Sequence, residues 1–279
     1  MKSLFDNLSH EISRLTTRRY STSFSLGIHF LNKSHHKAIY GIYGFVRFAD
    51  EIVDSFHDFD KKKLFDDFSA DTFHAIANKI SLNPILNSFQ WAVNKYNIPH
   101  ELIHSFLNSM EMDLNEDAHY DEDKFKEYIL GSAEVVGLMC LKVFVEGNEE
   151  NYKKLKPNAM SLGSAFQKIN FLRDLKNDFH SLGRSYFPDV DLNQFNDQIK
   201  KELEIDILKD FEHGYEGILK LPKKSKMGVY IAYIYYFNLF KKIKKTSAKE
   251  IMHKRIRISN KRKTTLLFVS YLKLKLKSI

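Results

Sequence analysis

The feature that most constrains this chain is a helix-length segment, residues 35–56, that is apolar on almost every side and carries two aspartates near its end. Its central run, residues 38–46, reads AIYGIYGFV. A helix that is apolar on most faces lies inside a bundle rather than on its surface. Asp50 and Asp54 therefore enter a buried setting, where carboxylates are costly unless they are paired with cations.

Apolar residues at three- and four-residue spacing predict six helices, over residues 5–19, 35–56, 99–115, 124–145, 158–180 and 225–246. The 279 residues include only 11 Gly and 5 Pro, too few for the many tight turns of an all-β chain. Helix breaks are expected at residues 32–34, 83–84, 97–99, 147–148 and 221–222, and a loop at 183–189. Residues 266–279 alternate Leu and Lys and leave strand and helix both open. With no repeat or linker in view, we predict an all-α bundle forming one domain over residues 1–279.

The cysteine content and the distribution of apolar residues indicate the cellular compartment of the protein. Cys140 is the only cysteine, so neither an intramolecular disulfide nor a Cys-rich metal framework is available. The N-terminus lacks the apolar stretch of a signal peptide, and no apolar run approaches the roughly 20 residues that span a bilayer. We expect a cytoplasmic protein.

The net charge of +8 is concentrated in the C-terminal segment. Residues 241–279 hold 14 Lys or Arg and one acid, Glu250, whereas the rest of the chain is net acidic. This distribution disfavours a protein-wide nucleic-acid surface. We expect no nucleic-acid partner, and we expect the basic segment 241–279 to make peripheral contact with the anionic inner membrane surface.

A second aspartate pair, Asp174 and Asp178, lies on the predicted helix 158–180. Gln167 and Asn170 precede it at helical spacing, so the four side chains form one polar stripe. Arg47 and Arg173 lie close to the two pairs, and arginine offers fixed donors for phosphate oxygens. Two unrelated buried Arg–Asp bridges are the structural alternative. Other four-residue pairs, such as Asp113 and Asp117, are interpreted as solvated surface.

The i,i+4 carboxylates suit hard cations, which take oxygen ligands and bind diphosphate oxygens on their free sides. If the two stripes face each other, they form a carboxylate-lined mouth above an apolar cavity. Such a site would stabilise a departing diphosphate and shield a carbocation from water.

At these residues the chain resembles the squalene/phytoene synthase family, over about residues 20–263. The resemblance rests on four motifs in order: YSTSFS at residues 20–25, AIYGIYGFVRFADEIVD at 38–54, QKINFLRDLKND at 167–178 and GRSYFP at 183–188. It implies an isoprenoid-synthase helical bundle around a central cavity.

The resemblance also implies roles for individual residues. The positions that match magnesium ligands are Asp50, Asp54, Asn170, Asp174 and Asp178, with Mn²⁺ as a substitute for Mg²⁺. The catalytic positions are Asp50, Asp54, Asp174, Asp178, Arg47 and Arg173. The positions that hold prenyl diphosphates are Tyr20, Ser21, Thr22, Ser23, Tyr43, Arg47, Gln167, Arg173, Arg184, Tyr186, Tyr236 and Arg255. For two of them a structural role is the alternative: Tyr236 as a packing residue and Arg255 as a surface residue.

Two departures from the family pattern occur. Glu51 stands where many relatives have a second aspartate, and the carboxylate is retained. Glu134 stands where relatives often have a small residue, which leaves the shape of the central cavity open.

The activity that the resemblance implies is prenyl transfer. Two geranylgeranyl diphosphates would condense head to head, through a cyclopropyl diphosphate, to phytoene in carotenoid biosynthesis, without NADPH. The alternatives are a C30 enzyme that makes dehydrosqualene or squalene from farnesyl diphosphate, and a non-catalytic helical scaffold of the same fold.

Overall fold

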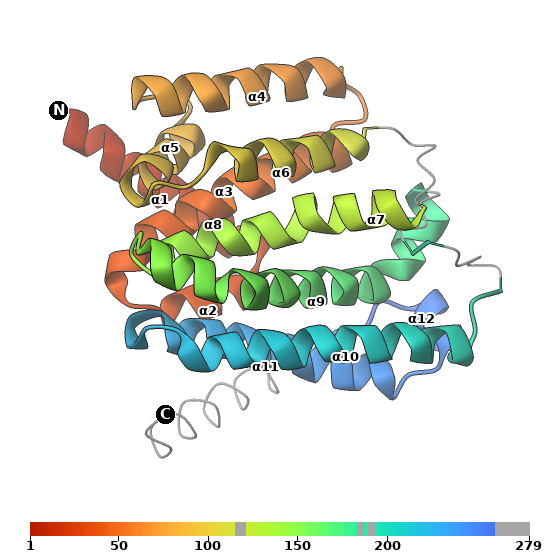
Figure 1. Cartoon of the computed structure of the whole chain (residues 1–279). Coiled ribbons are helices and arrows are strands. Elements are labelled where there is room, and N and C mark those ends of the chain that lie inside the picture. The colour runs from red at the N-terminus through yellow and green to blue at the C-terminus, as the bar shows by residue number, and fades with distance from the viewer. Residues whose placement is uncertain (115–120, 183–186, 189–193, 260–279) are drawn as a thin grey trace.

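Helix α3, Lys33–Ser55, packs against α1, α2, α4, α5, α6 and α8 in the computed structural model. The structure describes residues 1–114, 121–182, 187–188 and 194–259, with the backbone alone at 177–182. The other helices are α1 Lys2–Tyr20, α2 Thr22–His29, α4 Lys61–Asn78, α5 Pro84–Tyr96, α6 His100–Met112, α7 Glu122–Ile129, η1 Leu130–Glu134, α8 Val135–Phe144, α9 Glu149–Leu182, α10 Asp197–Lys220, α11 Lys223–Lys244 and α12 Ala248–His253. The described part of the chain contains no strand, so the predicted all-α fold is confirmed (Figure 1).

All six predicted helices are present, and two differ from the prediction. Helix α9 begins at Glu149, nine residues before the predicted start at residue 158, and runs through Pro157. The predicted helix 124–145 contains a π-helical turn, η1, between α7 and α8. A Cβ atom on Gly131 in this turn would lie 2.6 Å from the Ser105 carbonyl oxygen, so glycine permits the close approach of α6.

The predicted breaks fall where helices begin and end. The side chains of Asn32 and Asn83 accept hydrogen bonds from the first turns of α3 and α5. Asn97 ends α5 in the left-handed region at φ 50°, and Gly147 has φ 77°. Pro222 precedes α11. The expected loop at 183–189 lies mostly outside the described residues, and so does segment 266–279.

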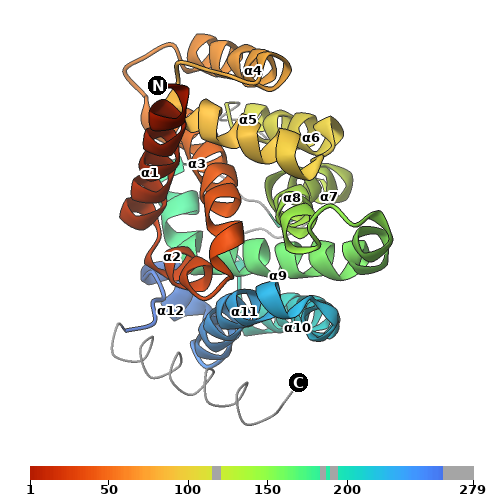
Figure 2. The same ribbon diagram turned by 90° about the vertical axis from the view of Figure 1, so that its left-hand side faces the viewer.

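Two large apolar clusters divide the bundle, and a smaller third one lies around Leu138 and Leu155. One is centred on α3, α5 and α6, where Phe45 stacks on Phe89 with ring centroids 3.9 Å apart. The other joins α9, α10 and α11 around Phe211 and Phe240. Figure 2 shows these two halves, with α3, α5 and α6 above α9, α10 and α11. Two cavities lie between these halves.

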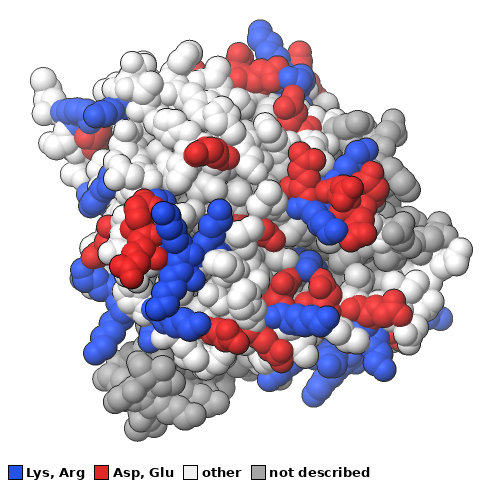
Figure 3. All heavy atoms as spheres, in the orientation of Figure 1, with Lys and Arg blue, Asp and Glu red and all other residues white. Residues whose placement is uncertain are grey.

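The surface carries charges of both signs. On the face in Figure 3, acidic and basic side chains are interspersed. Within the part of the chain that the structure describes, no helix is both long enough and apolar enough to cross a membrane.

Candidate active site

A polar cavity of about 730 Å³ lies where the α1–α2 junction, α3, α9, α11 and the segment after α12 meet. Every sequence-predicted site residue whose side chain the structure describes lines this cavity: Tyr20, Ser21, Thr22, Ser23, Tyr43, Arg47, Asp50, Asp54, Gln167, Asn170, Arg173, Asp174, Tyr236 and Arg255. The predicted residues Arg184 and Tyr186, and the side chain of Asp178, lie outside the described part. Segments separated by more than 200 residues thus meet in one site.

Helix α3 supplies one wall. Asp50 and Asp54 lie one turn apart, and Arg47, one turn earlier, forms ion pairs with Asp50 and Glu51. The Arg47 guanidinium carbon also lies 4.3 Å from the centroid of the Tyr20 ring, in cation–π geometry. These contacts hold the guanidinium of Arg47 toward the cavity.

Helix α9 supplies the facing wall. The Nδ2 of Asn170 donates to Oε1 of Gln167 at 3.3 Å, and the Tyr236 hydroxyl donates to Oδ1 of Asn170 at 3.3 Å. Burial raises the pKa of Tyr236 to about 12, although Arg173 opposes this shift, so the hydroxyl keeps its proton. The described part of the predicted polar stripe on α9, Gln167, Asn170 and Asp174, therefore lines the cavity, and α11 contributes a hydrogen bond to it.

Two arginines hold Asp174. The Nε of Arg173 donates to Oδ2 at 3.0 Å, and the Nε of Arg255 lies 2.6 Å from Oδ1. Burial opposes the charge on Arg173, but its hydrogen bond to Asp174 and their attraction raise the pKa of Arg173 overall. Both guanidinium groups lie beside the cavity.

Negative charge accumulates around Asp50. Burial raises its pKa, and the neighbouring carboxylates of Asp54 and Asp113 raise it further, while Arg47 lowers it. The side chain is 35 % exposed, but this exposure faces the cavity, whose walls enclose the carboxylate. Crowded carboxylates in a concave site favour a bound cation.

Asp113 is a site residue that the sequence interpretation missed. The sequence pattern predicts solvated surface for Asp113, yet it is 4 % exposed, lines the cavity and accepts a hydrogen bond from the Tyr128 hydroxyl at 2.7 Å. Its position at the end of α6 beside polar residues resembles a surface acid. Only the packing of α6 against α7 turns it inward.

The donors fit magnesium. Asp50, Asp54, Asp113 and Asn170 all present oxygen to one cavity, the ligand type that hard cations prefer. Among the described residues, no three acidic, His or Cys side chains converge closely enough to enclose a metal. Mg²⁺ is commonly held by one or two carboxylates together with substrate phosphates, so a complete protein cage is not required.

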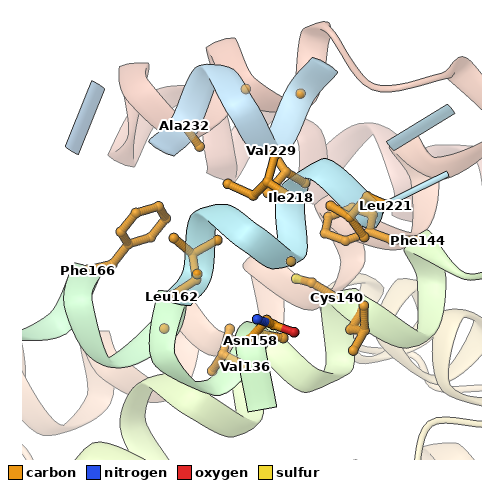
Figure 4. Close-up of a pocket in the computed structure, with 18 of the residues that line it drawn as sticks. Val136, Cys140, Phe144, Asn158, Leu162, Phe166, Ile218, Leu221, Val229 and Ala232 are labelled. Atoms are coloured by element: carbon orange, nitrogen blue, oxygen red, sulfur yellow. The ribbon is translucent and has the colours of Figure 1, made fainter. Parts of the chain in front are cut away.

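An apolar cavity of about 220 Å³ continues from the polar one, and the two share Phe24, Gln167 and Asn170. Figure 4 shows its wall of aliphatic and aromatic side chains, including Leu162, Phe166 and Val229. Cys140 also lines it, and burial raises the pKa of this thiol to about 12, so the thiol stays protonated. The site thus joins a charged mouth to a hydrocarbon-lined chamber.

Comparisons with known proteins agree with this geometry. The sequence model of the family described as squalene/phytoene synthase matches residues 17–262. The chain is similar to 4,4'-diapophytoene synthase of Staphylococcus haemolyticus, with 28 % identity over 68 % of this chain and 66 % of the relative. It is also similar to phytoene synthase of Mycobacterium tuberculosis, with 24 % identity over 69 % of this chain and 61 % of the relative.

The matched region thus spans about 61–66 % of the length of these curated relatives. Among solved structures, a dehydrosqualene synthase in complex with ligand superposes with a TM-score of 0.80, at 20 % identity, over 97 % of this chain and 98 % of the other. That likeness concerns the fold.

Proposed function

Because the chain belongs to the squalene/phytoene synthase family, we propose that it is a prenyltransferase that joins two allylic prenyl diphosphates head to head. The observation that carries this proposal is the continuity between the polar mouth and the apolar chamber. A prenyl diphosphate has a charged head and a long hydrocarbon tail, and this arrangement matches both parts.

The chain's own residues would bind and orient the diphosphates. Arg47, Arg173 and Arg255 supply cationic donors at the mouth, and Ser21, Thr22 and Ser23 add hydroxyl groups. Bound Mg²⁺, held by Asp50, Asp54, Asn170 and Asp174, would supply neutralisation of charge on the leaving diphosphate. We include Asp178 in this set, and Arg184 and Tyr186 among the substrate contacts.

Condensation would begin when one C–O bond breaks and the diphosphate leaves with its electron pair. The double bond of the second substrate captures the allylic cation, and loss of a proton closes a cyclopropane. Departure of the second diphosphate, rearrangement and loss of another proton give the hydrocarbon. The aromatic rings of Phe24, Phe166 and Tyr236 line the cavity walls, so they would exclude water and face the cation.

We propose geranylgeranyl diphosphate as substrate and phytoene as product, which requires no NADPH. The C30 alternative, dehydrosqualene from farnesyl diphosphate, has its own support, because the diapophytoene synthase relative shares 28 % identity and the phytoene synthase relative 24 %. A non-catalytic scaffold would not require the carboxylates that cluster around Asp50. We therefore rank it below the C40 and the C30 enzyme.

We further propose that the protein acts in the cytoplasm and that the basic segment 241–279 contacts anionic membrane peripherally. Mn²⁺ would replace Mg²⁺ at the same ligands.

The test is incubation of the purified protein with Mg²⁺ and, separately, geranylgeranyl and farnesyl diphosphate, without NADPH, followed by mass analysis of extracted hydrocarbon. Asp50→Asn should lower the rate at least about 100-fold, because it removes a carboxylate that faces the developing charge. Asp67→Asn, at an exposed acid of α4, is the matched control. A C30 product would support the alternative substrate, and no hydrocarbon from either substrate would contradict the proposed activity.

A further inference from the structure

Helix α1 has its polarity reversed relative to an ordinary surface helix. Its buried residues are Ser9, His10, Ser13 and Thr17, each at most 8 % exposed. Three leucines, by contrast, point outward. A surface helix normally buries its apolar stripe against the core and exposes polar residues.

The buried face of α1 is held by polar contacts and close packing. Ser9 accepts a hydrogen bond from Nδ2 of Asn87 at 3.1 Å, and His10 lies 3.0 Å from the Ser88 hydroxyl. A Cβ atom added to Gly44 of α3 would lie 3.3 Å from the Ser13 hydroxyl. Because these contacts do not involve the outward leucines, the fold has no need of them.

The exposed leucines share one face. Leu4, Leu8 and Leu15 are 74 %, 50 % and 56 % exposed. At 3.6 residues per turn their directions fall within an arc of about 40°, opposite the buried face. We call these three residues the leucine stripe. Figure 2 shows α1 along the outer edge of the bundle.

A neighbouring loop extends the apolar surface. Leu82, between α4 and α5, is 91 % exposed. The Asn87 side chain links this loop to α1, because its Nδ2 donates to Asp6 at 3.1 Å and its Oδ1 accepts from the Ser81 backbone at 3.3 Å. Figure 1 places the N-terminal end of α1 and the α4–α5 connection at the same end of the bundle.

Arginines flank the leucine stripe. Arg14 and Arg18 fall on one side of it and Arg19 on the other, and all three are exposed. Within the described residues none of them forms an ion pair. Glu11 is the one acid on this face. A stripe of apolar side chains bordered by unpaired cations is the pattern of a helix that lies in the interface of an anionic membrane.

We propose that α1 is a membrane-docking helix, with the leucine stripe inserted among acyl chains and the three arginines against anionic lipid headgroups. This goes beyond the proposed prenyl transfer and does not depend on it. A second copy of this chain is a poorer occupant, because two-fold pairing of the same face would bring like charges together. Tyr20, the last residue of α1, lines the polar cavity, so docking would hold the mouth of the site near the lipid.

The test is co-sedimentation of the full chain with vesicles of phosphatidylcholine alone and with about 30 % phosphatidylglycerol, the anionic headgroups being the source of attraction. The wild type should bind the anionic vesicles. The triple variant Leu4→Gln, Leu8→Gln, Leu15→Gln should bind at least tenfold more weakly, with unchanged turnover in detergent solution.

A matched control is Ile205→Gln with Leu219→Gln, at exposed apolar positions of α10, which should bind as the wild type does. Replacing Arg14, Arg18 and Arg19 with Gln should weaken the preference for anionic vesicles at least about threefold, with the basic segment 241–279 supplying the remainder. The same change at Lys201, Lys209 and Lys220 of α10 should leave that preference unchanged. Equal binding by the leucine variant would overturn the proposal. So would a wild type that ignores vesicles and forms a dimer dissociated by that variant.

Discussion

The hydroxyl of Tyr236 offers a sharp test of the site, because it can be removed without its ring. The ring stacks on Phe166 at a centroid distance of 4.1 Å and an interplanar angle of 15°, and Phe at position 236 would keep this contact. What Tyr236→Phe removes is the hydrogen bond to Oδ1 of Asn170, which is 3.3 Å long. The variant therefore isolates the support that α11 gives to one proposed magnesium ligand.

The expected magnitude follows from this geometry. A neutral hydrogen bond contributes about 0.5–1.5 kcal/mol net, and the long donor–acceptor distance favours the lower half of that range. Since about 1.4 kcal/mol corresponds to a tenfold change in rate, kcat/KM should fall by about 2- to 5-fold. The Mg²⁺ concentration that gives half the maximal rate should rise, because Asn170 loses the contact that orients it.

The assay is hydrocarbon formation across a Mg²⁺ titration, with thermal unfolding measured in parallel. Tyr233→Phe is the matched control, since Tyr233 is a buried tyrosine of α11, 7 % exposed, that lines neither cavity. Its kcat/KM and Mg²⁺ dependence should equal those of the wild type. A fall in melting temperature for Tyr236→Phe with unchanged kcat/KM and Mg²⁺ dependence would refute the positioning role.

Three further predictions concern stability. Burial lowers the pKa of His10 to about 4 from its ordinary 6.5, so the unfolded chain binds more protons between these values. The free energy of unfolding should therefore fall by up to about 3 kcal/mol, from this group alone, as pH drops from 7 to 4. In denaturant titrations at several pH values, His10→Asn should reduce this dependence on pH. An unchanged pH dependence would contradict the role of His10. In Gly217→Ala, the new Cβ atom would lie 2.3 Å from Cβ of Asn158. Its free energy of unfolding, measured by chemical denaturation, should be about 1–3 kcal/mol lower than that of the wild type. If the variant is as stable as the wild type, α10 can shift to accommodate the new methyl group without loss of stability. Burial, together with repulsion from Asp210, raises the pKa of Glu134, so its charge is unfavourable at neutral pH. Glu134→Gln should therefore raise the melting temperature by about 1–4 °C at pH 7. A decrease in melting temperature would show that the carboxylate is stabilising.

The sequence by itself determined the helical class and much of the site's membership. Three- and four-residue apolar spacing marked the main helices, because an α-helix buries one stripe or, as in residues 38–46, nearly its whole surface. The chain breaks were visible at Asn83 and Pro222, since caps and prolines act locally. The two aspartate pairs stood out because acids in apolar helices require partners.

Some local features escaped the sequence patterns. Helix α9 passes through Pro157, because the tertiary packing of a long helix outweighs the loss of one hydrogen bond. Helices α2, α4, α5, α10 and α12 were not predicted. In α4 and α10 many charged residues obscure the apolar spacing, and α2 and α12 have only 8 and 6 residues. In each case the local signal was weaker than the contacts made elsewhere in the fold.

Only the tertiary structure decided which residues converge. Asp113 looked like a surface acid and lies in the cavity, because α6 packs against α7. Arg255 lies far along the chain from Asp174, and its Nε comes within 2.6 Å of it. Leu4 and Ser9 differ from the ordinary pattern in opposite senses, the first exposed and the second buried. Burial and convergence depend on contacts between distant segments, and a pattern read along the chain contains no such distances.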